Sequence, residues 1–363
     1  MRCGHPRSDR GHARAQGKVR SMKVLIVGNS SDENLEASYM RAFRALNVDA
    51  KIVDPGAALR NKPAWRAKTV RRLFERRILK SFGRSYLETL CETDADMTLV
   101  FKGAFAVPEF WRQYKAARPK RILACYNADD PVANLSRGAN RPWITESIPC
   151  FDLYCTYKEA LLPDLLRLGA QRVVRIPFAW DPLVHPRSDT GEAGDVDVVF
   201  VGNGDAHRAN WLSRIMEDPR TRNWKVVVHG KWKPSLAKKL HGIELRGQVT
   251  GADMAQAIAG AKVSLNILRL QNEGSHNMRT FEVPGAGGLL ASQYSTEQDA
   301  FFPRDSGAVY FDDPKGAVSV IDALLRDRST RDAIRQAAHS RAQQNTYEAR
   351  ASQILQEFAK VRG

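Results

Sequence analysis

Residues 276–292 read His-Asn-Met-Arg-Thr-Phe-Glu-Val-Pro-Gly-Ala-Gly-Gly-Leu-Leu-Ala-Ser and follow the apolar run 262–268. This pattern predicts a strand, a polar loop, a short helix opened by a carboxylate, a glycine turn and a second strand. An open parallel sheet binds its ligand beyond the carboxyl ends of its strands, and a helix N-terminus at that place attracts anions. Arg279 and Glu282 are therefore candidate ligand contacts, and His276 and Asn277 lie on the same predicted loop.

The residue types in this segment indicate the kind of ligand. The two carboxylate oxygens of Glu282 suit the adjacent hydroxyls of a ribose, while Arg279 and the helix N–H groups suit a diphosphate. A nucleoside diphosphate satisfies all three. The alternative is that Glu282 only stabilises the helix dipole and that Arg279 is a surface charge. The adjoining Pro-Gly-Ala-Gly-Gly turn favours the ligand site.

Apolar runs along the chain predict two halves of alternating strands and helices. Strands of the first half are expected at 22–29, 50–53, 97–101, 121–126, 151–156 and 172–176. Strands of the second half are expected at 197–201, 225–229, 243–245 and 262–268. Residues 181–195 between the halves are rich in Pro, Gly, Asp and Ser, which predicts a linker. The fold class is therefore α/β, with two Rossmann-like, doubly wound domains facing a cleft.

The composition limits the class of protein. The chain of 363 residues is 43% apolar, enough for two cores, and no apolar run approaches the roughly 20 residues of a membrane span. Five scattered cysteines indicate reduced thiols and a cytoplasmic protein. Cys150 and Cys155 form the only close pair, without a second pair or a histidine cluster, so no structural metal is expected.

Positive charge concentrates in two segments of this chain, whose net charge is +16. Residues 1–21 are basic, lack the apolar region of a secretory signal and directly precede Met22. We therefore interpret 1–21 as a disordered leader, with Met22 as the true start. Residues 60–84 combine many Lys and Arg residues with apolar residues at three- and four-residue spacing. This predicts an amphipathic helix whose basic face lies on an anionic membrane, lies near a polyanionic acceptor or simply faces solvent.

A second glycine segment adds candidate phosphate contacts. Gly202, Asn203 and Gly204 follow the first predicted strand of the second half, so their backbone N–H groups could approach a phosphate. Arg208 in the next turn and Lys231 at a neighbouring strand end would add positive charge. An ordinary tight turn is the alternative. A dinucleotide cofactor is disfavoured, because the Gly-x-Gly-x-x-Gly pattern is incomplete and the acidic residue that should follow it is missing.

Carboxylates are expected at the cleft edge of the first half. Asp129 and Asp130 follow the strand at 121–126, so they emerge at its carboxyl end, and either could act as a general base toward an acceptor. Clustered aspartates could instead hold a divalent metal against a diphosphate, or the Asp-Pro turn could be purely structural. His207 and His276, on loops of the other half, could donate to a leaving phosphate.

These segments together resemble a known family. The residues that carry the resemblance are Asn277 to Glu282, Gly287 to Leu290, 297–302, 310–313 and a terminal helix ending near Arg350. They are similar to the C-terminal half of nucleotide-sugar glycosyltransferases of the spore maturation protein type, which have the two-domain GT-B fold. The likeness is strongest over 196–350 and continues more weakly over 126–131, 156–158 and 177–182.

The resemblance implies a plan for the chain. It predicts an acceptor domain at 22–180, a linker at 181–195, a nucleotide-sugar donor domain at 196–345 and a terminal helix at 346–363 that packs back on the first domain. Gly28, Asn29 and Ser30 would line the acceptor side. Related retaining transferases carry a second glutamate eight positions before the ribose-binding one, but Gly274 stands there, with Glu273 beside it. Either Glu273 substitutes in contacting the transferred sugar, or the sugar is handled differently.

We therefore expect a cytoplasmic glycosyltransferase that moves a sugar from a nucleoside diphosphate sugar to a glycan, lipid-linked or protein acceptor in cell-surface polysaccharide synthesis. No cofactor or metal is expected, because Arg208, Lys231 and Arg279 would stabilise the departing diphosphate. Peripheral contact with the inner face of an anionic membrane is expected, and nucleic acid is not an expected partner. The rival is a non-catalytic basic binding module, associated with nucleic acid or membrane, that retains the fold. The departure at Gly274 favours that rival, whereas the intact Arg279, Glu282 and glycine turn oppose it.

Overall fold

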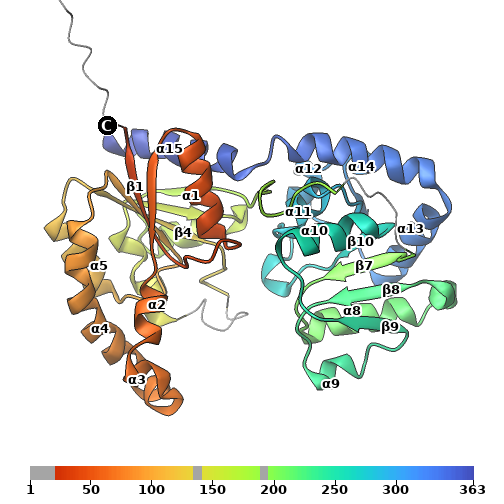
Figure 1. Ribbon diagram of the computed structural model, residues 1–363, viewed down its shortest axis with the longest axis horizontal. Helices are drawn as coiled ribbons and strands as arrows, with labels where there is room; N and C mark the ends of the chain where they lie inside the picture. The colour runs from red at the N-terminus through yellow and green to blue at the C-terminus, as the bar shows by residue number, and fades with distance from the viewer. Residues whose placement is uncertain (1–20, 134–140, 189–194) are drawn as a thin grey trace, which may run out of the picture.

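The computed structural model describes residues 21–133, 141–188 and 195–363, so the predicted leader lies almost wholly outside the described residues. Two parallel six-stranded sheets lie side by side, each flanked by helices (Figure 1). The strands of the first sheet are β1 (Lys23–Val27), β2 (Asp49–Val53), β3 (Met97–Phe101), β4 (Ile122–Asn127), β5 (Leu153–Thr156) and β6 (Val173–Arg175). Those of the second are β7 (Val198–Val201), β8 (Val226–His229), β9 (Ile243–Arg246), β10 (Val263–Asn266), β11 (Leu290–Gln293) and β12 (Val309–Phe311).

The helices fall into two groups along the chain. Those of the first half are α1 (Leu35–Ala45), α2 (Pro55–Arg60), α3 (Pro63–Arg66), α4 (Lys68–Glu92), α5 (Pro108–Ala117), α6 (Pro142–Glu146) and α7 (Leu162–Arg167). The later helices are α8 (Ala206–Met216), α9 (Pro234–Ala237), α10 (Gly251–Gly260), α11 (Arg279–Gly285), α12 (Thr296–Phe301), α13 (Pro314–Arg326), α14 (Arg328–Ala342) and α15 (Tyr347–Arg362). Within the described ranges, no helix combines the length and apolar character needed to span a bilayer.

The strand order places one switch point in each sheet. The orders are β2-β1-β3-β4-β5-β6 and β12-β11-β10-β7-β8-β9. The direction of winding therefore reverses between β1 and β3 in the first sheet and between β7 and β10 in the second. Helices diverge at such a point, which leaves a crevice beyond the carboxyl ends of the strands. The predicted α/β class with two doubly wound sheets is confirmed.

Both faces of the first sheet are covered, which explains its continuous apolar strands. Val24 and Ile26 of β1 face a core shared with α1 and α15, while Leu25 and Val27 face a core shared with α4 and α5. Figure 1 shows α15 leaving the second half of the molecule to lie beside α1. Ile354 of α15 is fully buried there, and burial of such a side chain stabilises by about 1.5–3 kcal/mol. The terminal helix thus ties the second half to the first.

The basic stretch is not one amphipathic helix, so that prediction is wrong in part. Pro63 opens a separate short helix, and α4 starts at Lys68, bends at Phe74 (φ −123°, ψ 20°) and continues to Glu92. Leu79 and Phe82 of α4 are buried as the spacing predicts. Three large apolar residues before them are exposed: Val70 (41%), Leu73 (70%) and Phe74 (45%).

The two halves meet in a buried joint around His276, which has no exposed surface. Its Nε2 accepts a hydrogen bond from the backbone N–H of Phe178 at 3.2 Å, so Nδ1 carries the proton and donates to Glu297 at 2.7 Å. Glu297 also accepts from the Ser275 hydroxyl at 2.6 Å and the Glu159 N–H at 3.0 Å. One carboxylate therefore takes hydrogen bonds from both halves.

Burial and hydrogen bonding together set the protonation states in this joint. It lowers the pKa of His276, which stays neutral. Burial acts to raise the pKa of Glu297, but the hydrogen bonds from His276 and Ser275 outweigh it and lower that pKa to about 2. The prediction that His276 lies at the cleft and donates to a leaving phosphate is therefore wrong, because both ring nitrogens are engaged inside the joint.

The joint predicts a pH-dependent stability. A carboxyl whose folded pKa lies below its unfolded value stabilises the fold above the unfolded value near 4.5, and this stabilisation is lost as the pH falls toward about 2. We expect Glu297→Gln to lower the free energy of unfolding by about 3 kcal/mol at pH 7 and by about 1 kcal/mol at pH 3. Chemical denaturation at the two pH values measures both differences.

Glu88→Gln is the matched control, because Glu88 is exposed on α4 and should show no loss at either pH. If Glu297→Gln lowered the free energy of unfolding equally at pH 7 and at pH 3, the ionised Glu297 carboxylate would not be the group that stabilises the joint.

Candidate functional site

Two adjoining cavities lie at the switch point of the second sheet. The first cavity has a volume of about 220 Å³ and is lined from the second half by Val201, Gly202, Arg279 and Glu282, among others, and from the first half by Glu33 and Asn34. The second cavity has a volume of about 360 Å³ and is lined by Arg208, Arg269, Gln271, Arg279 and, from the first half, Asp129. Both cavities share Gly202, Asn203 and Arg279. The structure therefore forms a cleft between the halves at the place where a doubly wound sheet binds ligands.

A partly buried ion pair lies between the cavities. Glu282 is only 2% exposed, and its carboxylate pairs with the guanidinium of Arg279 one turn earlier on α11. The Nε of Arg279 also donates to the carbonyl of Val201 at 3.1 Å, at the end of β7. This arrangement holds a carboxylate and a guanidinium side by side at the carboxyl edge of the sheet.

The loop before α11 is organised by its own side chains. The Asn277 side-chain oxygen accepts the N–H of Thr280 at 3.1 Å, and its amide donates to Asn266 at 2.9 Å. These bonds hold the start of α11 against β10. Asn277 also lines the second cavity. The N–H of Thr280, one of the helix N–H groups expected to bind a ligand, already donates to Asn277.

Glycines bring the ends of β7 and β8 close together. A Cβ on Gly230, which has φ +149°, would lie 2.2 Å from the carbonyl oxygen of Gly202. Gly204 packs under Trp232, with 2.4 Å between an added Cβ and the ring, and does not line either cavity. Of the predicted glycine segment, Gly202 and Asn203 therefore face the cleft, whereas Gly204 serves the packing.

Three arginines make the second cavity strongly positive. Arg208 is buried, its Nε donates to the carbonyl of Ile267 at 3.0 Å, and burial lowers its pKa to about 10 with a further contribution from Arg269. It therefore remains charged at neutral pH, beside Arg269 and Arg279. Lys231 is exposed and lines neither cavity.

The two aspartates of the first half have different surroundings. Asp129 lines the second cavity, where Lys102 Nζ lies 2.5 Å from its Oδ2 and the amide of Gln271 donates to Oδ1 at 3.4 Å. Asp130 is buried, and its Oδ1 accepts the N–H groups of Val132 and Ala133, both at 2.9 Å. Asp130 therefore forms the turn, and only Asp129 faces the cavity.

Several predicted residues lie outside the cavities. Glu273 is exposed on its loop beside Gly274, which has φ +72°. His207 lies in the first turn of α8, its ring 6.0 Å from that of Trp211. Neither Glu273 nor His207 lines either cavity.

The predicted acceptor-side segment follows β1. The backbone N–H of Asn29 donates to Glu36 at 2.9 Å, and the Ser30 hydroxyl contacts Asp54 at 3.3 Å. An added Cβ on Gly28 would lie 2.6 Å from the side chain of Glu36, so a larger residue there would displace that side chain. The three residues do not line the two cavities, although Glu33 and Asn34 just after them do.

Two residues at the cleft were not predicted. Lys102 directly follows β3 in the left-handed conformation (φ +63°), which is strained for a residue with a side chain. The sequence did contain a signal for Lys102, because it is a basic residue placed directly after a predicted strand. His185 lines the first cavity with its Nδ1 3.9 Å from the carboxylate of Glu282. It lies in the segment predicted as a linker, but Asp181, paired with Arg41 at 2.6 Å, shows that this part of the segment is packed.

The comparisons with known proteins agree with this geometry. Residues 208–356 match a family described as glycosyl transferase-like. No curated protein matches the sequence. Among solved structures, HepE from Anabaena in complex with UDP and glucose has a TM-score of 0.67 at 12% identity, covering 93% of this chain and 100% of that one. Sucrose-phosphate synthase from Thermosynechococcus elongatus has a TM-score of 0.70 at 12% identity, covering 94% and 99%.

A glycosyltransferase from Rickettsia africae is also similar, with a TM-score of 0.64 at 9% identity over 94% of this chain and 98% of that one. The resemblance to glycosyltransferases of the GT-B fold, stated from the sequence, is thereby confirmed. Residues 208–356 are thus similar to a glycosyl transferase-like domain, and the chain has the two-domain GT-B fold.

Proposed function

We propose that this protein transfers a sugar from a nucleoside diphosphate sugar to an acceptor. The observation that carries the proposal is the Arg279–Glu282 pair, placed between two cavities at the switch point of a glycosyl transferase-like domain. Similar structures hold UDP, or UDP with glucose. Those ligands are bound to the similar proteins. They support a nucleotide-sugar donor for this protein because a ribose and a diphosphate suit the carboxylate and the arginines of its cleft.

The two cavities divide the donor between them. The nucleoside occupies the first cavity, where the two oxygens of Glu282 accept hydrogen bonds from the ribose hydroxyls. The diphosphate lies at the boundary, where Gly202 lets the backbone approach and Arg279 supplies charge. In the structure Arg279 pairs with Glu282. Donor binding therefore replaces this ion pair with a contact from Glu282 to the ribose and a contact from Arg279 to the diphosphate. The sugar then extends into the second cavity toward Asp129.

Catalysis follows from positioning and charge. As the bond from the sugar's anomeric carbon to the diphosphate oxygen breaks, that oxygen keeps the electron pair and gains negative charge. Arg208, Arg269 and Arg279 stabilise this charge in a partly enclosed site, where preorganised cations are effective. The acceptor hydroxyl forms the new bond to the anomeric carbon and gives its proton to Asp129, the carboxylate that faces the cavity. These residues provide the positive field without a metal ion.

The acceptor is a glycan, a lipid-linked molecule or a protein, and the enzyme works in the cytoplasm with peripheral contact to an anionic membrane. The exposed Val70, Leu73 and Phe74 support this contact, because they stand among arginines on α4. Apolar residues flanked by cations suit the interface of an anionic bilayer.

The donor site predicts two separable binding defects. Glu282→Gln should weaken binding of both uridine and UDP by about 1–3 kcal/mol, the range for a hydrogen bond to a charged group. Arg279→Gln should weaken UDP binding more than uridine binding, because only UDP carries the diphosphate. Isothermal titration calorimetry without added metal measures all four affinities.

Glu217→Gln is the matched control, because Glu217 is exposed at the end of α8 and lines neither cavity. Unchanged UDP affinity in a folded Glu282→Gln variant would remove Glu282 from the site. Strict dependence of UDP binding on magnesium or manganese would contradict the metal-free mechanism.

The membrane contact predicts a charge-dependent association. Replacing Arg66, Arg71 and Arg72 with Gln should weaken binding to vesicles of phosphatidylglycerol and phosphatidylcholine by roughly 100-fold, at about 1 kcal/mol for each charge. UDP binding should not change, because the donor site lies in the other half. Vesicle co-sedimentation at several salt concentrations measures the effect.

The control makes the same charge change at three exposed arginines of the second half, Arg214, Arg222 and Arg341. Equal loss of vesicle binding in both triple variants would show that net charge, and not this helix, controls the association.

A further inference from the structure

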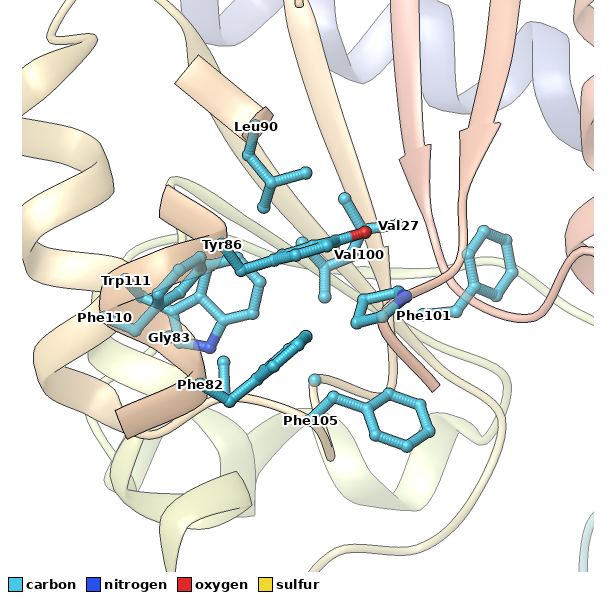
Figure 2. Close-up of a pocket in the computed structure, with 13 residues that line it drawn as sticks. Val27, Phe82, Gly83, Tyr86, Leu90, Val100, Phe101, Phe105, Phe110 and Trp111 are labelled. Carbon is cyan, nitrogen blue, oxygen red and sulfur yellow. The ribbon is translucent and has the colours of Figure 1, made fainter. Parts of the chain in front are cut away.

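Two buried ring nitrogens that have no hydrogen-bond partner among the described residues line cavities: Trp111 Nε1 and His185 Nδ1. Trp111 lines an apolar crevice between α4, α5 and the ends of β1 and β3 (Figure 2). That crevice has a volume of about 20 Å³, which is space for about one water molecule and for no larger ligand. His185 lines the first cavity of the cleft, which has a volume of about 220 Å³. The unpaired nitrogen of His185 therefore lies at a site with room for a ligand.

The imidazole of His185 faces the buried carboxylate of Glu282. Its Nδ1 lies 3.9 Å from Oε1, whereas Arg279 pairs with Oε2 of the same carboxylate. Among the described residues, no other basic side chain pairs with Glu282. Nδ1 can donate a hydrogen in the neutral ring as well as in the imidazolium, but 3.9 Å is roughly 1 Å too long for a hydrogen bond. His185 is therefore close to Glu282 without being bonded to it.

The segment that carries His185 is fixed against α11. The indole N–H of Trp180 donates to the carbonyl of His185 at 2.7 Å. The same indole packs on Gly285, the last residue of α11, where an added Cβ would lie 2.3 Å from the ring. Just beyond the histidine, the N–H of Ser188 donates to the carbonyl of Ala286 at 3.2 Å. These contacts keep the imidazole beside the carboxylate.

Donor binding removes the cation from this carboxylate. In the proposed reaction Arg279 turns from Glu282 toward the diphosphate. Glu282 is only 2% exposed, and a buried charge that loses its ionic partner is strongly destabilising. The ribose hydroxyls donate to the carboxylate but carry no charge. A further N–H donor would therefore stabilise the donor complex, and His185 is the residue placed to supply it.

We propose that His185 is a positioning residue that donates a hydrogen bond to Glu282 when Arg279 moves to the diphosphate of the donor. This inference rests on the proposed function, because it assigns a role to a further residue of the same site. The imidazole moves by roughly 1 Å, so that Nδ1 donates to Oε1 while the ribose hydroxyls use the other acceptor positions of the carboxylate. His185 thereby keeps Glu282 oriented for the ribose and makes the release of Arg279 less unfavourable.

Uridine and UDP distinguish this role from a general one, and isothermal titration calorimetry on the full chain measures both affinities. Uridine carries the ribose but no diphosphate, so Arg279 stays with Glu282 and His185 is not needed. His185→Phe keeps a ring but has no N–H. It should weaken UDP binding by about ten-fold, as expected for the loss of a hydrogen bond to a charged group, and leave uridine binding almost unchanged.

Two further variants complete the binding experiment. His185→Asn retains an N–H donor close to the position of Nδ1, so it should bind UDP more tightly than His185→Phe does. His241→Phe is the matched control, because His241 is exposed and lines neither cavity, and it should change neither affinity. If His185→Asn bound UDP as weakly as His185→Phe, the N–H donor would not be the group that matters.

The ligand-free protein provides an independent measurement. In Arg279→Gln the carboxylate of Glu282 has no cation even without a ligand, so His185 should already donate to it. His185→Phe should therefore lower the melting temperature more in the Arg279→Gln background than in the wild-type background, which thermal unfolding measures as a double-mutant cycle. An equal decrease in both backgrounds would overturn the coupling between the two residues.

The UDP titrations separate this inference from the proposed function. If the wild-type chain binds UDP and His185→Phe binds it as tightly, or if His185→Phe weakens uridine and UDP binding equally, the positioning role is overturned while the proposed function stands. If the wild-type chain does not bind UDP, the proposed function fails, and this inference fails with it.

Discussion

The hydrogen bond from His276 to Glu297 is the interaction on which the rest of the structure depends. It lies where the two halves of the chain meet, with Phe178 and Glu159 of the first half donating into it through backbone N–H groups. A cleft between two sheets requires that their carboxyl edges face each other at a defined separation. Buried, fully bonded polar groups can define that separation, because any shift leaves a donor or an acceptor unpaired at high cost.

The cleft that results combines groups that no single half could supply. The second half provides the buried carboxylate of Glu282 and a cluster of arginines, and the first half provides Asp129 held by Lys102. Glu282 pairs with Arg279 and Asp129 pairs with Lys102, so each of the two carboxylates has a cationic partner. A ligand with a ribose and a diphosphate can replace the Arg279–Glu282 pair group by group. The strained backbone at Lys102 places its ammonium against Asp129 on the wall of the cleft that the first half provides.

The sequence predicted what depends on local pattern. Strands buried on both faces are continuous apolar runs, so their positions and the α/β class could be read directly. Arg279 and Glu282 were predicted together at the ligand edge because they follow a strand within one short segment. The structure places both beside the two cavities, and their contacts with a ligand remain a prediction.

Features that depend on contacts between residues distant in sequence could not be predicted from local pattern. His276 looks like a loop histidine until Phe178 and Glu297, distant in sequence, are brought to its two nitrogens. Asp129 and Asp130 are equivalent in the sequence, and only the turn shows that Asp130 binds backbone N–H groups. The basic stretch has helical spacing throughout, but Pro63 and the bend at Phe74 divide it and leave its first apolar residues exposed.

A crystal structure of the protein with UDP tests the central claim most directly. The account predicts that the ribose hydroxyls lie within hydrogen-bond distance of the Glu282 carboxylate. It also predicts the diphosphate beside Gly202, with Arg279 turned from Glu282 toward the phosphate oxygens. UDP bound elsewhere on the chain, with the Arg279–Glu282 pair intact, would contradict it.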